Sequence, residues 1–206
     1  MKFDIKISKN PIDFIQSQKI LEKRVQDIQN GSAKNLVWIL EHPNLYTGGT
    51  SSNNYDLLDD KKFPLYKTSR GGKWTFHGKG QKIVYFCIKL EEKNIREFVR
   101  KIENWIINIL KFYKIESFND KDNIGIWVKN KNQEIEKIAA IGIRVKKWVA
   151  FHGFCLNIKV NKSNYEGIIP CGIKDKGIAN MDDFINTGNM SNIEDVIIEN
   201  YKKIFE

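Results

Sequence analysis

Residues 70–90 have the sequence RGGKWTFHGKGQKIVYFCIKL, in which a glycine-rich segment runs directly into an apolar one. The first part, residues 70–81, contains four glycines. Each glycine costs about 0.5–1 kcal/mol relative to alanine inside a helix or strand. We therefore predict a loop over 70–81 that lets backbone approach a ligand closely. The apolar part, residues 82–90, is predicted to be a buried strand that holds this loop.

The composition is typical of a globular protein. The chain has 206 residues, of which 41% are hydrophobic and 12% aromatic, and we predict one domain over residues 1–206. No apolar run reaches the roughly 18–20 residues of a membrane helix, and no signal-like apolar stretch follows a basic start. The three cysteines have neither a disulfide nor a zinc pattern. We expect a cytoplasmic protein with no membrane partner.

The net charge of +9 is compatible with two kinds of partner. Basic domains neutralise nucleic-acid phosphates, and they also attract acidic proteins and speed the encounter with them. The lysines are scattered along the chain, and the aromatic residues fall mostly on predicted core stripes, without an RNA-recognition signature. We therefore favour acidic protein partners and no nucleic acid, with a basic nucleic-acid-binding module as the non-enzymatic alternative.

Hydrophobic periodicity predicts an α/β fold in which strands outnumber helices. Helices are predicted over 11–30, 94–113 and 192–205, the first with Pro11 at a favourable start and Gly31 as a stop. Strands are predicted over 2–7, 36–41, 63–69, 82–90, 123–129, 134–145 and 148–158. The segments 42–50 and 51–63 are predicted to be loops. Because tight polar turns join the later strands, we expect a mixed, mostly antiparallel sheet.

Cys171 is the candidate nucleophile. It lies between Pro170 and Gly172, and since proline restricts its preceding residue while glycine is permissive, the thiol is presented on a defined turn. Cys87 and Cys155 lie in predicted apolar strands, where cysteine behaves as a small hydrophobe. The alternative for Cys171 is an inert loop thiol.

Lys137 stands out because a period of two places it on one strand face with Ala139, Ile141 and Ile143. Desolvation on an apolar face favours the neutral amine, which can act as a base. The alternative is a strand that begins after Lys137 and an ammonium group that reaches water. Spacing alone favours this alternative.

The histidines and the remaining glycine pattern give no indication of a bound metal or cofactor. Three histidines without carboxylates at ligand spacing are weak evidence for a metal. The Gly-x-Gly at 78–80 lacks the third glycine of a dinucleotide fingerprint and precedes a strand. His77 is a candidate binding residue because it lies in the glycine-rich segment, whereas His152 is either a binding residue or a hydrogen-bonded core residue.

Four segments together resemble the octanoyl-[acyl-carrier-protein]:protein N-octanoyltransferases, also called lipoyl(octanoyl) transferases or lipoate-protein ligase B. They are EHPNLYTGG (41–49), RGGKWTFHGKGQ (70–81), KIAAIGIRVKKWVAFHGFCLNI (137–158) and IIPCGI (168–173). They occur in the family's order and cover about residues 35–180. The chain departs from the family at Lys79, where proline is common, and at GIANM (177–181), where Gly-Val-Thr-Ser-Leu is usual.

The resemblance implies a single catalytic domain of the α+β type shared with biotin and lipoate ligases. It also implies a catalytic pair in which Cys171 carries the acyl thioester and Lys137 is the general acid and base that lowers the pKa of the cysteine. The substrate-binding residues that it implies are Arg70, Gly71, Gly72, Lys73, Trp74, Thr75, Phe76, His77, Ala139, Ala140, Ile141, His152, Gly153 and Phe154.

The activity that the resemblance implies is octanoyl transfer, the first step of endogenous protein lipoylation. The donor would be octanoyl-acyl carrier protein, and the acceptors would be lysines of the lipoyl domains of 2-oxoacid dehydrogenase complexes and of the glycine cleavage H protein. We expect a monomer without cofactor. Two alternatives are an ATP-dependent lipoate- or biotin-type ligase and a hydrolase that pairs Cys171 with His77 or His152.

Overall fold

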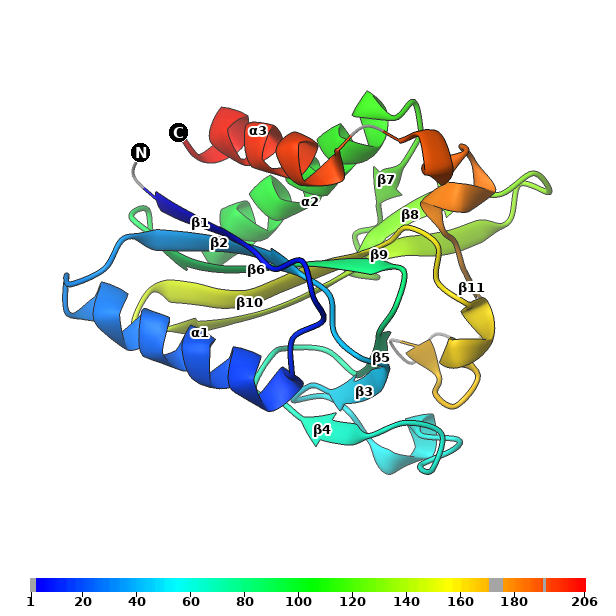
Figure 1. Ribbon diagram of the computed structural model, residues 1–206, viewed down its shortest axis with the longest axis horizontal. Coiled ribbons are helices and arrows are strands. Elements are labelled where there is room, and N and C mark those ends of the chain that lie inside the picture. Colours follow the sequence, from blue (N-terminus) through cyan, green and yellow to red (C-terminus); the bar gives the residue numbers. More distant parts are fainter. Residues whose placement is uncertain (1–2, 171–175, 191) are drawn as a thin grey trace.

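The computed structural model describes residues 3–170, 176–190 and 192–206. A central sheet lies between two helical layers (Figure 1). Helices α2 (Ile95–Phe112) and α3 (Ile193–Phe205) cover one face, and helix α1 (Phe14–Gln29) covers the other. This arrangement confirms the predicted α+β class.

The central sheet has the strand order β1-β2-β6-β10-β9-β8-β7, with β11 paired to β9. Its strands are β1 (Phe3–Ile7), β2 (Asn35–Leu40), β6 (Gln81–Lys89), β7 (Phe118–Asn119), β8 (Ile126–Lys129), β9 (Ile135–Lys146), β10 (Val149–Asn157) and β11 (Gly177–Ile178). The β1–β2 and β9–β11 pairs are parallel and the other pairs are antiparallel. The predicted mixed, mostly antiparallel sheet is therefore confirmed.

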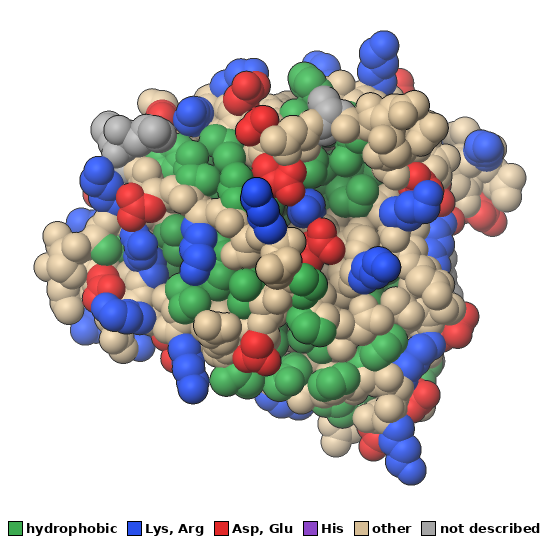
Figure 2. All heavy atoms as spheres, viewed as in Figure 1, with side chains coloured by type: hydrophobic (Ala, Val, Ile, Leu, Met, Phe, Trp, Pro, Cys, Tyr) green, Lys and Arg blue, Asp and Glu red, His purple; other side chains and the backbone are tan. Residues whose placement is uncertain are grey.

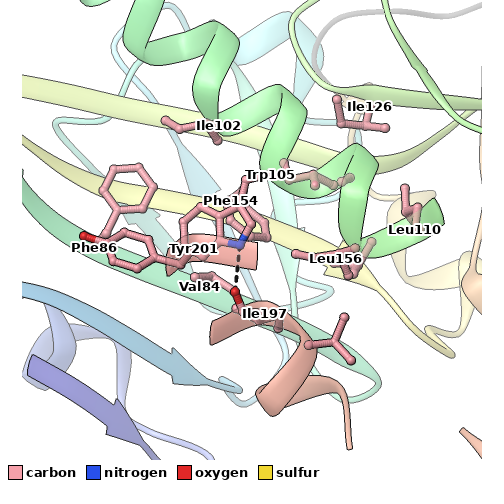
Figure 3. Packing of buried hydrophobic residues seen from close by; sticks show 14 of the residues in the cluster. Val84, Phe86, Ile102, Trp105, Leu110, Ile126, Phe154, Leu156, Ile197 and Tyr201 are labelled. Carbon is pink, nitrogen blue, oxygen red and sulfur yellow. Dashed lines mark hydrogen bonds between the residues drawn. The ribbon is translucent and has the colours of Figure 1, made fainter. Parts of the chain in front are cut away.

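Strand β6 is buried on both faces, as its continuous apolar sequence predicts. Val84, Phe86 and Ile88 belong to the core under α2 and α3, and the alternate residues pack against α1. Trp105 of α2 lies in the first core, where its indole N–H donates to the carbonyl oxygen of Ile197 at 2.8 Å (Figure 3). This bond joins α2 to α3.

Helices α1, α2 and α3 each begin at a polar cap. Asp13 accepts a hydrogen bond from the N–H of Gln16, so α1 begins at Phe14, and the predicted start at residue 11 is three residues too early. The side chains of Asn94 and Asn192 cap α2 and α3 in the same way. Within the part of the chain that is described, no helix combines the length and the apolar character needed to cross a membrane.

A second sheet of three strands corrects two of the predicted loops. It has the order β4-β3-β5, with β3 (Leu45–Gly48), β4 (Leu65–Lys67) and β5 (Trp74–His77). The predicted loop over 42–50 is wrong because β3 occupies its centre. The predicted loop over 70–81 is wrong in its middle, because its glycines lie on either side of β5 and so leave a four-residue strand between them.

Candidate functional site

A cavity of about 530 Å³ lies where the glycine-rich segment meets the edge of β9. The N–H of Gly71 donates to the carbonyl oxygen of Ile143 at 2.9 Å, which holds the segment against β9. The predicted site residues that line the cavity are Arg70, Gly71, Gly72, Lys73, Thr75, His77, Lys137, Ala140, Ile141, His152, Gly153 and Phe154. Segments far apart in the sequence therefore meet at one cavity.

Three of the predicted binding residues do not line this cavity. Trp74 and Phe76 pack in a small core under the second sheet, whereas Thr75 and His77 lie at the cavity, as alternation along β5 requires. Ala139 is buried in the core under α2. The role of these three residues in binding stays a prediction.

Arg70 braces the glycine-rich segment. Its Nη2 donates to the carbonyl oxygen and the hydroxyl of Thr47, at 2.7 and 2.8 Å, and to the carbonyl oxygen of Lys73 at 3.0 Å. Its Nη1 donates to the carbonyl oxygen of Gly71 at 2.9 Å. One guanidinium group thus ties β3 to both ends of the turn before β5, which fixes this wall of the cavity.

Lys137 is buried, and its side chain contacts Ile124 and Trp127. Its exposed fraction is 5%, its Nζ donates to the carbonyl oxygen of Ile124 at 3.1 Å, and Nζ lies 4.5 Å from the ring centroid of Trp127. The interpretation that spacing favoured, a strand starting after Lys137 and an ammonium group in water, is wrong. Strand β9 begins at Ile135, and the indole of Trp127 on β8 covers the lysine.

Cys171 lies outside the described residues, but the chain on both sides of it is anchored. On one side, the N–H of Ile169 donates to the carbonyl oxygen of Asp56 at 2.8 Å. On the other side, Ile178 of β11 pairs with Lys137 itself, and the N–H of Ala179 donates to the carbonyl oxygen of Lys137 at 3.0 Å. The described chain after Cys171 therefore pairs, at Ile178, with the strand that carries Lys137.

Cys87 and Cys155 are buried in strands of the central sheet, as predicted. Burial raises the pKa of the Cys87 thiol to about 12, so this thiol stays protonated and inert. Cys155 differs because it lines the cavity.

The three histidines of the chain are held neutral by burial. Desolvation lowers the pKa of His77 and of His152 to about 3 and that of His42 to about 4. His152 has a φ of 69°, and its Nε2 lies 3.1 Å from the hydroxyl of Ser69. Among the described residues, no group of three or more His, Cys, Asp or Glu side chains is arranged to hold a metal ion.

Several cavity residues were not predicted from the sequence. Phe14 of α1, Thr47 of β3 and Tyr85 of β6 line the cavity, and so do Ile95 and Val99 of α2. Thr47 falls in the predicted loop over 42–50. The other four positions match the apolar stripes and buried strands of the predicted core, so periodicity alone cannot separate them from ordinary core residues. For Tyr85, the sequence offered one signal of a role in the cavity: a tyrosine in a buried strand needs a hydrogen-bond partner for its hydroxyl.

The family model of the lipoyl protein ligase A/B catalytic domain matches residues 13–202. An octanoyltransferase of Wolbachia pipientis (subsp. Culex pipiens, strain wPip) is 45% identical over 97% of this chain and 98% of that protein. An octanoyltransferase of Ehrlichia chaffeensis is 43% identical over 100% of this chain and 98% of that protein.

Solved structures of lower sequence identity share the fold. A lipoate-protein ligase A bound with ATP superposes with a TM-score of 0.79 at 15% identity, covering 99% of this chain and 85% of that one. A bipartite lipoate protein ligase from Thermoplasma acidophilum gives 0.75 at 12% identity, over 99% and 84% of the two chains. The chain belongs to the lipoyl protein ligase A/B catalytic-domain family, and within it to the octanoyltransferases, the acyltransferases of protein lipoylation.

Proposed function

We propose that the octanoyl group passes through a thioester on Cys171 and that Lys137 carries the protons. The burial of Lys137 in the cavity wall is the observation that carries this proposal. An amine with an apolar surrounding and one carbonyl partner is suited to exchange a proton with a neighbouring group. The pairing of Ile178 with Lys137 supports the proposal, because it brings the segment after Cys171 to the same strand.

In the first half-reaction, Lys137 takes the proton of the Cys171 thiol, and the thiolate attacks the thioester carbonyl of octanoyl-acyl carrier protein. A sulfur–carbon bond to Cys171 forms and the bond to the carrier sulfur breaks. Lys137 returns the proton to the leaving sulfur. Because one thioester replaces another, the reaction needs a thiolate and good positioning more than a large driving force.

In the second half-reaction, the ε-amine of a lysine on a lipoyl domain attacks the Cys171 thioester. Lys137 takes a proton from the attacking nitrogen as the amide bond forms, and Cys171 leaves as a thiolate. The tetrahedral oxyanion needs N–H donors, each typically contributing ~3 kcal/mol. Since the N–H of Gly71 already donates to Ile143, Gly72 and Gly172 are the remaining candidates.

The neutral histidines argue against the hydrolase alternative. A general base works best when its pKa lies near the operating pH, whereas burial lowers the pKa of His77 and of His152 to about 3. Neither imidazole is therefore suited to activate Cys171 or a water molecule at neutral pH.

The donor in this proposal is octanoyl-acyl carrier protein. The acceptors are lipoyl domains of 2-oxoacid dehydrogenase complexes and the glycine cleavage H protein. The enzyme acts as a cytoplasmic monomer without a cofactor, in a reducing compartment that keeps Cys171 a thiol. The charge of +9 suits acidic partners of this kind.

Mass spectrometry tests the acyl-enzyme. Incubation with octanoyl-acyl carrier protein should add one octanoyl group to the wild type and none to Cys171→Ala. Lys137→Met should keep the melting temperature within a few degrees and form the adduct at least ~100-fold more slowly. An adduct on Cys171→Ala, or a wild-type rate in Lys137→Met, would sink the mechanism.

An ATP-dependent ligase is the second candidate, because the ATP-bound lipoate-protein ligase A has the same fold. The two activities differ in the acyl donor. We expect no product from free octanoate with ATP and magnesium, and full product from octanoyl-acyl carrier protein without ATP. The reverse result would establish the ligase.

A further inference from the structure

We propose that Nε2 of His77 accepts a hydrogen bond from the amine that attacks the acyl-enzyme, and that Gln81, Asn157 and Tyr165 are positioning residues for His77. The proposal rests on the proposed two-step transfer. It gives His77 a defined chemical role, and it extends the site to three buried side chains behind the cavity wall.

Gln81, Asn157 and Tyr165 form a hydrogen-bonded relay behind His77. The partners of Asn157 identify which end of its side-chain amide is the nitrogen and which is the oxygen. Its Nδ2 donates to the carbonyl oxygen of Ala179 at 3.1 Å, so its Oδ1 is the acceptor. That oxygen accepts from the hydroxyl of Tyr165 at 3.1 Å and from Nε2 of Gln81 at 2.9 Å. Nε2 of Gln81 also donates to the Tyr165 hydroxyl at 3.1 Å, which uses both of its hydrogens.

The orientation of Gln81 then determines the tautomer of His77. With both hydrogens of Nε2 used, Oε1 of Gln81 faces His77, at 2.9 Å from its Nδ1. An amide oxygen only accepts, so Nδ1 of His77 carries the hydrogen. Nε2 of His77 is therefore left with a free lone pair. Gln81 has no exposed surface, so water does not compete for these bonds.

The free nitrogen is open to the cavity. His77 lines the cavity, and no described group bonds its Nε2. Among the described side chains, the nitrogen and oxygen atoms that are fully buried and lack a hydrogen-bond partner do not include Nε2 of His77. Since Nε2 has no described partner, it must therefore retain some exposed surface, which faces the cavity. Desolvation keeps the ring neutral by lowering the pKa of His77 to about 3. At neutral pH this atom accepts hydrogen bonds and does not donate them.

An acceptor of this kind requires an N–H donor on the substrate. The octanoyl chain and the thioester group have none, whereas the attacking lysine amine brings N–H groups to the reacting carbon. A hydrogen bond to His77 would orient the nitrogen lone pair toward that carbon. Lys137, in the same cavity wall, would take the proton that is released.

Two variants of His77 distinguish the roles of its two ring nitrogens. His77→Gln places an amide near the position of Nε2, and His77→Asn places one near Nδ1 and leaves the cavity side empty. In single-turnover assays, we expect His77→Asn to slow transfer from the isolated acyl-enzyme to a lipoyl domain by about 10- to 100-fold, and His77→Gln by only a few-fold. In His77→Asn, acyl-enzyme formation should be slowed much less than the transfer step.

Equal rates for the two variants in the transfer step would overturn the proposal. So would a loss confined to acyl-enzyme formation, because the N–H donor would then belong to the carrier's pantetheine arm. Absence of any adduct on wild-type Cys171 is a different result, since it refutes the two-step mechanism and leaves the relay untouched.

The relay has a spectroscopic test that does not depend on turnover. The chain has three histidines, so the ¹⁵N signals of their rings can be assigned by substitution. We expect His77 in the wild type to show a protonated Nδ1 and a bare Nε2, and Gln81→Met to show a mixture of the two tautomers. A protonated Nε2 in the wild type, or an unchanged tautomer in Gln81→Met, would refute the positioning role.

Discussion

At the scale of single residues, close backbone approach explains Gly153 better than substrate contact alone. A Cβ atom at this position would overlap the carbonyl oxygen of Val84, on the neighbouring strand β6. At Gly71 the nearest atom to such a Cβ is the carbonyl oxygen of Ile143, at 3.4 Å, which is an ordinary contact. There is therefore room for a Cβ atom at Gly71 but not at Gly153, although both glycines line the cavity.

We expect Gly153→Ala to lower the free energy of unfolding by at least ~2 kcal/mol, since the strands must separate to admit a methyl group. Gly71→Ala is the matched control and should change it by less than ~1 kcal/mol. Urea denaturation monitored by tryptophan fluorescence measures both. Equal losses in the two variants would contradict the packing argument.

The buried histidines make stability depend on pH. The folded-state pKa values of His42, His77 and His152, at about 4, 3 and 3, lie below the unfolded value of 6.5. The unfolded chain therefore binds more protons below pH 6.5, so each histidine destabilises the fold as the pH falls from there toward its folded pKa. Between pH 7 and pH 5 the cost is about 2 kcal/mol for each histidine.

Unfolding free energies at pH 7 and pH 5 test this dependence. The wild type should lose about 2 kcal/mol more across this interval than His42→Gln does. Direct titration of the three imidazoles by NMR is the second measurement, and it does not require a stable variant. An imidazole of the folded protein that titrates near pH 6.5 would show that burial does not hold that ring neutral.

At the scale of elements, Trp105 holds α2 and α3 together. It is fully buried, packs on Phe154 and Tyr201, and donates its indole N–H to the carbonyl oxygen of Ile197. These contacts cover the face of the sheet that lies opposite α1. Trp105 therefore packs both helices against Phe154 of β10, the strand that pairs with β9.

Trp105→Phe should lower the free energy of unfolding by about 2–3 kcal/mol, since it leaves a small cavity and an unpaired carbonyl group. Phe112→Leu on the same helix is the control. Phe112 is 57% exposed, so its replacement should stay within about 0.5 kcal/mol of the wild type. Thermal and urea denaturation measure both variants, and similar losses would contradict the role given to Trp105.

At the scale of the whole molecule, the positive charge is dispersed. Figure 2 shows Lys and Arg side chains spread over one face, with Asp and Glu side chains between them. A dispersed excess charge attracts an acidic partner from a distance without a single strong contact. We expect the charge to raise the rate at which the enzyme and its partner meet, and to make their association depend on salt concentration.

The KM for octanoyl-acyl carrier protein should rise several-fold between 50 and 500 mM salt, with kcat nearly unchanged, because salt screens the attraction between exposed charges. Octanoyl-pantetheine, a neutral thioester with the same reacting group, is the control and should show no such rise. Steady-state kinetics on both donors gives the comparison. A parallel rise for the neutral donor would place the salt effect on the enzyme itself.

The sequence by itself determined the elements whose signal is local. The apolar stripe of α2 and the continuous apolar runs of β6 and β10 appear where predicted, because a helix or strand period is written in neighbouring residues. The face of β9 that buries Lys137 does not follow from this period. The register shifts between Ile126 and Trp127, so Lys137 pairs with Trp127 while Ala139 packs in the core under α2, and the predicted shared face of Lys137 and Ala139 is wrong. The motifs that resemble the octanoyltransferases also lie in contiguous segments.

Only the tertiary structure decided how these segments meet. The second sheet pairs β3 with β5, whose short lengths and flanking glycines hide them from any periodicity. The polar relay joins His77 and Gln81 to Asn157 and Tyr165, which are far away in the sequence. Such contacts depend on strand register and on the packing of distant segments, and a local pattern contains neither. The cavity exists because the fold brings the glycine-rich segment to Ile143, in the part of β9 that pairs with neither β8 nor β11.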